Sequence, residues 1–206
     1  MIKYILFDFD GTLADSKDVF ISTWNQLADK YKFKKIHHQD LDALRKLSIK
    51  ERAKQLNFPL YKIPLVVPEV YRLYKKSIKD IILFDGVKLL LDELESRGYQ
   101  IVIISSNSEG NIKEFLRENA VDSVKEVLCS SKIFGKDQVI KKFLQTNKLK
   151  GSEVIYIGDE CRDIIACKKV PVKIIWVGWG YDSVELVTPE KPDYMVHMPE
   201  EILNIL

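Results

Sequence analysis

The amino-acid sequence predicts an α/β fold, in which a doubly wound parallel sheet forms the core and an all-helical cap domain is inserted into it. Short apolar segments rich in β-branched residues alternate with amphipathic segments of helical period along most of the chain. One long stretch near the N-terminus interrupts this alternation and carries only helical patterns. Strands that alternate with helices form parallel sheets with right-handed crossovers, so all strands should end at the same edge.

The composition is typical of a soluble globular protein. The 206 residues carry a net charge of +2, with basic and acidic residues interspersed, so neither nucleic acid nor a membrane is an expected partner. No apolar run is long enough to span a bilayer, and no leader pattern is visible. The three cysteines, Cys129, Cys161 and Cys167, lack metal-binding spacing, which favours free thiols. We expect a cytoplasmic protein, either a monomer or a homodimer.

The first strand leads into a turn with two acidic residues. Residues 4–7 are four consecutive apolar residues that predict a buried strand, and the Asp-Phe-Asp-Gly sequence after them predicts a turn. Strand alternation directs Asp8 and Asp10 to similar sides, with Phe9 pointing away. Ligands of open α/β sheets bind beyond this edge. Two adjacent carboxylates favour a hard cation such as Mg²⁺, although the same pattern also occurs in ordinary turns.

The predicted cap comprises residues 16–82, and the core comprises residues 1–15 and 83–206. Asp15 and Ser16 are candidate N-caps for the first cap helix. Apolar residues recur at helical spacing from Phe20 to Tyr31, from Leu41 to Leu47 and from Pro68 to Ile78, and a capping box at Ser48–Glu51 opens a helix through Leu56 that Pro59 and Pro64 end. No clear strand is predicted between residues 16 and 82.

The rest of the core follows a regular strand–helix order. Strands are predicted at 101–104, 124–128, 154–157, 173–177 and 194–196. Helices are predicted from Val87 to Leu94 with Gly98 as a stop, around Ile112–Leu116, from Lys136 to Leu144 and briefly at the C-terminus.

Polar residues follow two more of these strands. Ser105 directly follows one strand, and the backbone amides of Ser106 and Asn107 at the next helix start suit phosphate oxygens. Asp159 and Asp163 follow another strand and share one helix face. Each has a simpler interpretation, because serine and asparagine commonly cap helices and aspartate complements a helix dipole.

Lys136 lies at the start of a predicted helix and adds a positive charge to the same edge. By itself it is equally well interpreted as one surface lysine among many. The combination of Lys136 with the acidic and hydroxyl residues, in this order after buried strands, is poorly explained by chance.

The set resembles the haloacid dehalogenase-like hydrolase superfamily, whose members are mostly phosphatases. The resemblance covers nearly the whole core. The first family motif, D-x-D-G-T, is matched by Asp8, Asp10, Gly11 and Thr12; the second by Ser105, or alternatively by Ser106-Asn107; the third by Lys136 in Phe134-Gly135-Lys136; and the fourth, G-D-x-x-x-D, by Gly158, Asp159 and Asp163. Trp179-Gly180 and the position of the cap also resemble the phosphoglycolate phosphatase-like branch, which has a Rossmann-like core and a helical cap.

The resemblance implies a mechanism. Asp8 would be the nucleophile that forms an aspartyl-phosphate, and Asp10 would be the general acid and base, which requires a raised pKa. Mg²⁺ would bind Asp8, the Asp10 carbonyl, Asp159 and Asp163, the last directly or through water. Ser105 and Lys136 would hold the transferring phosphoryl group, and the phosphate-binding set is completed by Gly11, Thr12, Ser106 and Asn107. An acid at Asp10 implies an oxygen leaving group, because a halide leaves without a proton.

The leading hypothesis is therefore a Mg²⁺-dependent phosphomonoester hydrolase acting on a small phosphorylated metabolite. A phosphomutase on the same scaffold is the first alternative, and a non-catalytic domain that binds a phosphorylated ligand is the second. Substrate choice is expected to depend on the cap, where Arg45, Lys46 and Arg52 are candidates to meet a second anionic group. A solvated helix face explains each of these three residues equally well.

Overall fold

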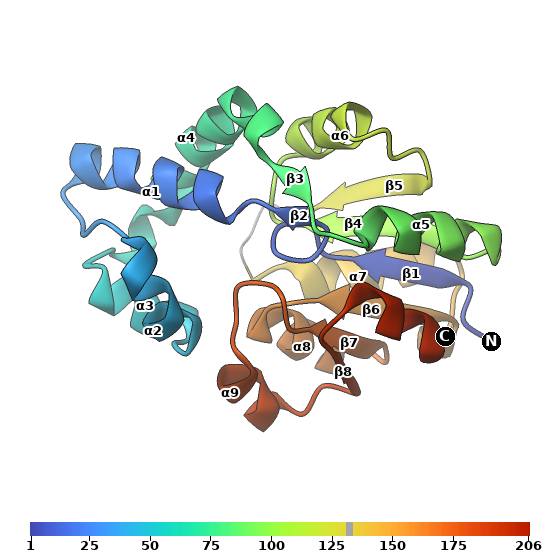
Figure 1. The fold of residues 1–206 in the computed structure, drawn as a ribbon. Helices are drawn as coiled ribbons and strands as arrows, with labels where there is room; N and C mark the ends of the chain where they lie inside the picture. The colour runs from blue at the N-terminus through green and yellow to red at the C-terminus, as the bar shows by residue number, and fades with distance from the viewer. Residues whose placement is uncertain (131–133) are drawn as a thin grey trace.

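A computed structural model describes residues 1–130 and 134–206, and its central element is a parallel sheet (Figure 1). The six strands have the order β5-β4-β1-β6-β7-β8. They are β1 (Tyr4–Phe7), β4 (Gln100–Ser105), β5 (Val124–Cys129), β6 (Val154–Gly158), β7 (Lys173–Val177) and β8 (Tyr194–Val196). Every neighbouring pair is parallel, which confirms the predicted doubly wound α/β sheet.

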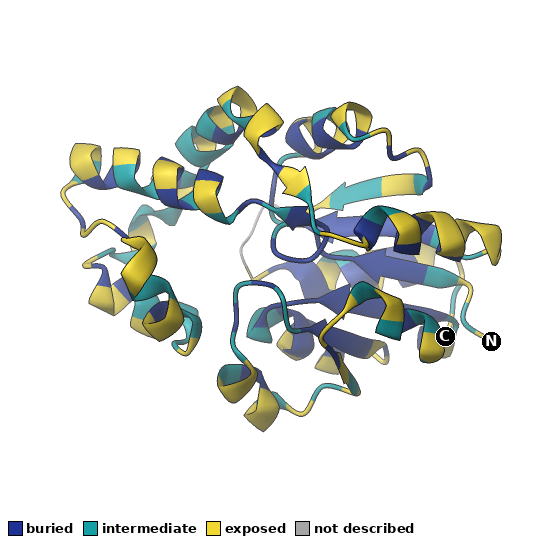
Figure 2. Cartoon of the chain, in the orientation of Figure 1, coloured by how far each residue is buried: buried dark blue, intermediate teal, exposed yellow. Residues whose placement is uncertain are grey.

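Both faces of the sheet are apolar and covered by helices, as strand alternation requires for a sheet buried on two sides. On one face Ile5 and Phe7 pack with residues of α5 (Val87–Ser96) and α6 (Glu109–Glu118). On the other face Leu6 packs with residues of α7 (Lys136–Thr146) and α8 (Cys161–Lys168). The inner strands β4, β1, β6 and β7 are accordingly almost wholly buried, whereas the edge strands β5 and β8 are partly exposed (Figure 2).

This alternation decides where the first acidic residue points. Asp8 continues the parity of Leu6, so its side chain lies on the face covered by α7 and α8. Phe9 lies on the opposite face, where its ring meets Phe115 edge-on at a centroid distance of 5.0 Å. The predicted divergence of Phe9 from Asp8 is confirmed.

A helical segment between β2 and β3, here called the cap, lies beyond the carboxyl ends of the strands and away from the two termini (Figure 1). It contains α1 (Lys17–Tyr31), α2 (Leu41–Arg45), α3 (Ile49–Gln55) and α4 (Ile63–Lys76), with single 3₁₀ turns at His38–Asp40, Leu60–Lys62 and Ile78–Asp80. The predicted division at residues 16 and 82 lies beside its two connections to the core, and the separation into two domains stays a prediction.

Those connections form a two-stranded antiparallel ribbon of β2 (Ala14–Asp15) and β3 (Ile82–Leu83). The prediction of no strand up to residue 82 was wrong at Ile82, because a two-residue strand is too short to leave a periodic pattern. The predicted start of the last cap helix at Pro68 was also wrong. α4 begins at Ile63 and carries Pro64 in its first turn, where the missing proline N–H costs no hydrogen bond.

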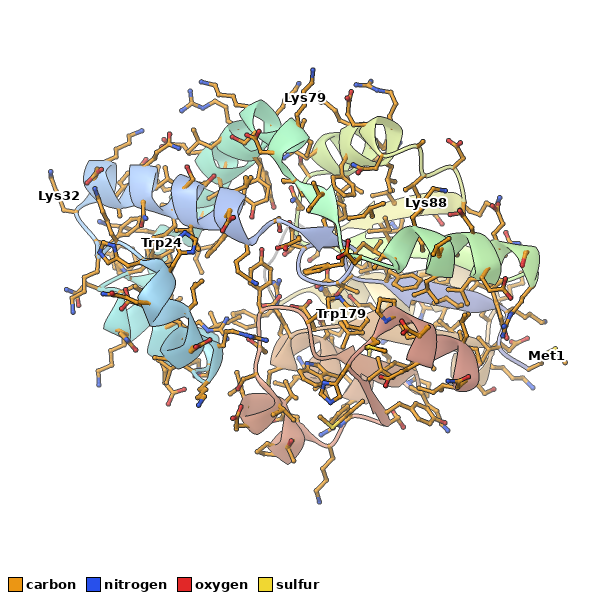
Figure 3. All side chains as sticks on the ribbon, viewed as in Figure 1. Met1, Trp24, Lys32, Lys79, Lys88 and Trp179 are labelled. Atoms are coloured by element: carbon orange, nitrogen blue, oxygen red, sulfur yellow. The ribbon has the colours of Figure 1, made fainter. Side chains whose placement is uncertain are left out.

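The capping box of α3 is confirmed. The Ser48 hydroxyl accepts from the Glu51 amide at 3.4 Å, and the Glu51 carboxylate accepts from the Ser48 amide at 2.8 Å. The cap has its own aromatic cluster around Trp24, which is labelled in Figure 3. The Trp24 ring contacts those of Phe33 and Phe58 at centroid distances of 4.7 and 5.2 Å. The cap thus has two apolar clusters of its own, while Val19, Tyr74 and Ile78 at its base belong to the larger core cluster.

The C-terminal part completes the core with α9 (Val184–Val187) and 3₁₀ turns at Gly151–Glu153, Thr188–Glu190 and Pro199–Asn204. The predicted C-terminal helix is the last of these 3₁₀ turns. Among the residues described, no helix combines the length and apolar character needed to cross a membrane.

Candidate active site

The first element of the site is a buried lysine between two aspartates. Lys136 begins α7, and its Nζ lies 2.6 Å from Asp8 Oδ2 and 2.6 Å from Asp163 Oδ1. All three side chains are at most 2% exposed. Burial alone lowers the pKa of Lys136, but the charges of Asp163 and Asp8 more than offset it, so the pKa is raised and the lysine is charged at neutral pH.

The two carboxylate oxygens of Asp8 have different surroundings. Its Oδ1 accepts a 2.7 Å hydrogen bond from the Phe9 amide. Its buried Oδ2 faces Lys136 as an ion pair and has no hydrogen-bond donor of suitable geometry among the described residues. Burial raises the pKa of Asp8, while Lys136 opposes that rise and favours the carboxylate.

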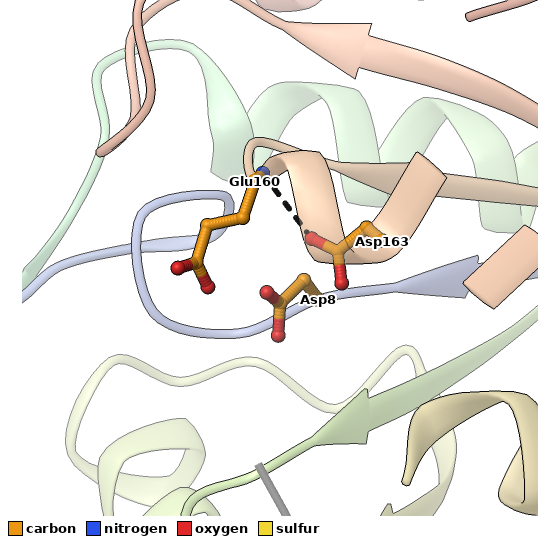
Figure 4. Close-up of side chains that lie close together, drawn as sticks. All are labelled: Asp8, Glu160 and Asp163. Carbon is orange, nitrogen blue, oxygen red and sulfur yellow. Dashed lines mark hydrogen bonds between the residues drawn. The ribbon is translucent and has the colours of Figure 1, made fainter. Parts of the chain in front are cut away.

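A third carboxylate joins these residues. Oxygen atoms of Asp8, Glu160 and Asp163 all lie within 4.8 Å of one another, and all three residues are buried (Figure 4). Glu160 was missed at the sequence level, because only the two aspartates of its motif have the spacing of one helix face. The available sequence signal for Glu160 was its position directly before the helix that carries Asp163. In the structure the Glu160 amide donates to the Asp163 carboxylate at 3.3 Å.

The donor set of this trio fits Mg²⁺. Hard carboxylate oxygens are the preferred ligands of that ion, and Asp8 Oδ2, although paired with Lys136, is a buried oxygen without a hydrogen-bond donor among the described residues. The described site holds the carboxylates of Asp8, Asp10, Asp159, Glu160 and Asp163 against the cations Lys136 and Arg162, an excess of negative charge that a divalent ion would reduce.

Asp159 is not one of these three carboxylates, although the family resemblance makes it a candidate Mg²⁺ ligand. Its Oδ1 accepts from the Thr12 hydroxyl at 2.9 Å, and its Oδ2 accepts from the Tyr181 amide at 2.6 Å. A Cβ at Gly11, which has a φ of +82°, would overlap both the Asp159 carboxylate and the Tyr181 ring. The Gly11 amide donates to the Ala14 carbonyl, so the first motif here builds a tight turn that encloses Asp159.

Asp10 has surroundings that suit an acid. Its Oδ1 accepts from the Ser16 hydroxyl at 2.7 Å, and its Oδ2 accepts from Asn107 Nδ2 at 2.9 Å. Burial raises the pKa of Asp10, and the two hydrogen bonds oppose that rise. Ser16 occupies the N-cap position of α1 but makes no side-chain cap, because its hydroxyl is used on Asp10.

The two candidate serines lie on different sides of β4. Ser105 is 1% exposed, and its hydroxyl accepts from the Asn107 amide at 3.0 Å in a local turn. Ser106 has the parity of Asp8, and its hydroxyl accepts from Arg162 Nη1 at 3.2 Å. The structure therefore turns the hydroxyl of Ser106, rather than that of Ser105, toward the charged groups of the site.

Arg162 is a second site residue that was not predicted from the sequence. Its side chain is 15% exposed, and its guanidinium pairs with Glu160 through two nitrogens and donates to the Ser106 hydroxyl. Burial alone would lower the pKa of Arg162, but the charges of Glu160, Asp163 and Asp8 raise it above its ordinary value. The guanidinium is therefore permanently charged. Its place between Asp159 and Asp163 in the motif was the available signal.

The three basic cap residues contact the core. Arg52 forms a hydrogen-bonded ion pair with Asp182, a residue that is 4% exposed and also accepts from the Cys161 amide at 2.7 Å. Arg45 donates to the Gly178 carbonyl at 3.4 Å, and Lys46 lies 3.8 Å from Glu185 at the surface. These contacts join the cap to the segment after β7, and a substrate role for the three residues remains a prediction.

Comparison with known proteins gives the same family over most of the chain. Residues 5–177 match the family of haloacid dehalogenase-like hydrolases. The chain is 28% identical over 204 residues to a phosphoglycolate phosphatase of Synechococcus elongatus, covering 98% of this chain and 96% of that protein. It is 24% identical over 210 residues to the pyrophosphatase PpaX of Bacillus velezensis, covering 99% and 96%.

Solved structures share the fold. A haloacid dehalogenase-like family hydrolase from Streptococcus pneumoniae superposes with a TM-score of 0.83 at 22% identity, over 99% of this chain and 98% of that one. A structure from Clostridium acetobutylicum, described as a predicted phosphatase, has the same TM-score and identity, over 100% and 98%. The likeness extends over the core and the cap together.

Proposed function

We propose that this chain, which belongs to the haloacid dehalogenase-like hydrolase family and is a phosphatase of that family, hydrolyses small phosphomonoesters. The proposed reaction uses Mg²⁺ and passes through an aspartyl-phosphate on Asp8. The observation that carries the proposal is the environment of Asp8. One of its oxygens is fixed by the Phe9 amide, and the other is buried and faces a cation at 2.6 Å. The Phe9 amide orients the carboxyl group, and Lys136 opposes the rise in the Asp8 pKa that burial causes.

The proposed reaction has two steps. In the first, an Asp8 carboxylate oxygen attacks phosphorus, the bond from phosphorus to the leaving oxygen breaks, and Asp10 gives that oxygen its proton. In the second, water attacks the aspartyl-phosphate, Asp10 takes the proton, and inorganic phosphate leaves with Asp8 restored. The raised pKa of Asp10 supports its starting protonated.

The remaining groups supply charge. Asp8, Glu160 and Asp163 are the residues that would hold Mg²⁺, with Asp159 and the Asp10 carbonyl as further candidates from the family resemblance. When bound, the ion would neutralise charge on the phosphoryl oxygens. Uncatalysed phosphate-monoester hydrolysis is so slow that enzymes accelerate it up to about 10²¹-fold, mostly by positioning and charge neutralisation.

Three side chains of this protein are proposed to hold the phosphoryl group. Lys136 and Arg162 supply positive charge, and Arg162 adds the planar geometry that suits phosphate. Ser106 is the favoured hydroxyl, because it lies beside Arg162 at 3.2 Å, whereas the Ser105 hydroxyl is used in its own turn.

A phosphoanhydride is the second candidate substrate class. The relative from Bacillus velezensis is named a pyrophosphatase and covers nearly all of this chain. A pyrophosphate leaving group needs less protonation than an alcohol, so Asp10 would matter less for that substrate.

Phosphate release from p-nitrophenyl phosphate, phosphoglycolate, sugar phosphates and pyrophosphate tests the proposal. The assay is run with Mg²⁺, with EDTA and with Asp8→Asn, and the matched control is Asp85→Asn, which changes an exposed aspartate outside the site. We expect Asp8→Asn to lose roughly 10⁴-fold or more of the activity, EDTA to abolish it and Asp85→Asn to retain it.

Two results would contradict the proposal. One is undiminished release by correctly folded Asp8→Asn protein. The other is no release from any compound by folded wild type that binds Mg²⁺. In the latter case, analysis for isomerised sugar phosphates would show whether the protein is a mutase.

A further inference from the structure

Three hydroxyl groups lie beside Asp10 and come from three separate parts of the chain. Ser16 lies between β2 and α1, Tyr74 lies on cap helix α4, and Tyr181 lies in the segment after β7. Ser16 Oγ is 2.7 Å from Asp10 Oδ1 and 2.8 Å from the Tyr181 hydroxyl oxygen. Burial raises the pKa of Tyr74, and hydrogen bonding with Ser16 and Tyr181 acts against that rise, which places its hydroxyl in the same group.

The direction of these hydrogen bonds follows from the number of protons. A serine hydroxyl has one proton, so when Ser16 donates to ionised Asp10 its oxygen accepts from Tyr181. Asn107 holds Asp10 from the other side, and its amide orientation is fixed because its Oδ1 accepts from the Ser108 amide at 2.7 Å. Asp10 is therefore held through both oxygens, and one side of this support passes through Tyr181.

The same residues join the core to the cap. The Tyr181 ring contacts Phe20 of α1 at a centroid distance of 6.0 Å, while its amide donates to Asp159 in the core. Tyr74 is 4% exposed and belongs to α4. Ser16 is the first residue of the cap, so its contacts with Asp10 and Tyr181 link the cap to the core while the cap is seated as it is here.

We propose that Tyr181 and Tyr74 are positioning residues that orient Asp10 through Ser16, so that seating of the cap completes the general acid. The inference rests on the proposed role of Asp10. Neither tyrosine exchanges a proton with substrate. Their effect is to fix the direction of the carboxyl group that protonates the leaving oxygen.

A leaving-group comparison separates this role from general support of the fold. An alkoxide needs a proton to leave, whereas p-nitrophenolate leaves readily without one. For Tyr181→Phe and Tyr74→Phe we expect kcat for an alkyl phosphate to fall about tenfold, a part of the 10²–10⁴ that general acid catalysis contributes. We expect kcat for p-nitrophenyl phosphate and both KM values to change less than twofold.

Two controls accompany the comparison. Tyr31→Phe removes a tyrosine hydroxyl that bonds Glu69 elsewhere in the cap, and it should leave the ratio of the two rates unchanged. In an Asp10→Asn background, Tyr181→Phe should cause no further selective loss, because the group that it positions is gone. Equal proportional losses with both substrates, or a full additional loss in the double variant, would overturn the proposal.

A crystal structure of the Tyr181→Phe variant gives a test that does not depend on turnover. We expect the Ser16 hydroxyl to turn away from Asp10 and the carboxyl group to rotate. An unmoved Ser16–Asp10 contact would overturn the inference even if wild type hydrolyses every substrate. A rotated carboxyl group in a protein without phosphatase activity would support the inference on positioning and contradict the proposed function alone.

Discussion

Two lysines make nearly identical contacts in the two parts of the molecule. At the edge of the core sheet, Lys136 Nζ lies 2.6 Å from Asp8 and Asp163, and the lysine is 2% exposed. In the cap, Lys30 Nζ lies 2.7 Å from Glu69, but the lysine is 56% exposed. Water can replace the second contact and not the first, so burial, not distance, separates an ion pair that shapes a site from one on a solvated surface.

Removing each lysine should produce the largest contrast. In Lys136→Met, two buried carboxylates lose their counter-charge, and breaking a buried pair typically costs about 3–5 kcal/mol. Lys30→Met should leave unfolding unchanged within error. Urea unfolding of both variants in EDTA measures this, and hydrolysis should fall roughly 10²–10³-fold for Lys136→Met alone. Similar behaviour of the two variants would show that burial does not distinguish these sites.

The next effect concerns pH. Burial raises the pKa of Asp10, and the protonated form is the one that gives a proton to the leaving oxygen. Below that pKa the acid is present, so kcat for an alkyl phosphate should fall as pH rises through it. Asp10→Asn should lower that rate by about 10²–10⁴-fold and remove this limb of the profile. Retention of the limb in Asp10→Asn would assign the titration to another group.

A smaller effect distinguishes the two serines. Ser106→Ala should raise KM for phosphomonoesters about tenfold, because a hydrogen bond to a charged group is worth about 1.5–3 kcal/mol. Ser105→Ala should instead lower the free energy of unfolding by about 1 kcal/mol and leave KM almost unchanged. Steady-state kinetics and urea unfolding of both variants decide between them, and the opposite pattern would restore Ser105 as the phosphate ligand.

The smallest effect is expected at the cap surface. Lys46 and Glu185 are 3.8 Å apart, with side chains 58% and 60% exposed. Lys46→Ala should change KM less than twofold for substrates with or without a second anionic group. A selective rise in KM for the doubly anionic substrates would instead give this lysine the substrate role that the sequence analysis considered.

Local patterns were sufficient for the sheet and for part of the site. The apolar runs located the six core strands of the described residues. The parity of β1 directed Asp8 to the face covered by α7, which begins with Lys136, and by α8, which carries Asp163 in its first turn. These features depend on periods of two and 3.6 residues, and on strands ending at one edge, which a sequence displays directly.

The direction of each side chain beyond a strand end depends on partners far along the chain. Thr12 and Asp159 are 147 residues apart, yet their hydrogen bond, with that of the Tyr181 amide, turns the Asp159 carboxylate into the first turn. Glu160 is left beside Asp8, and Asp10 is held by Ser16 and Asn107. No local period encodes such contacts, because they form only when separate loops pack together and buried polar groups must find donors and acceptors.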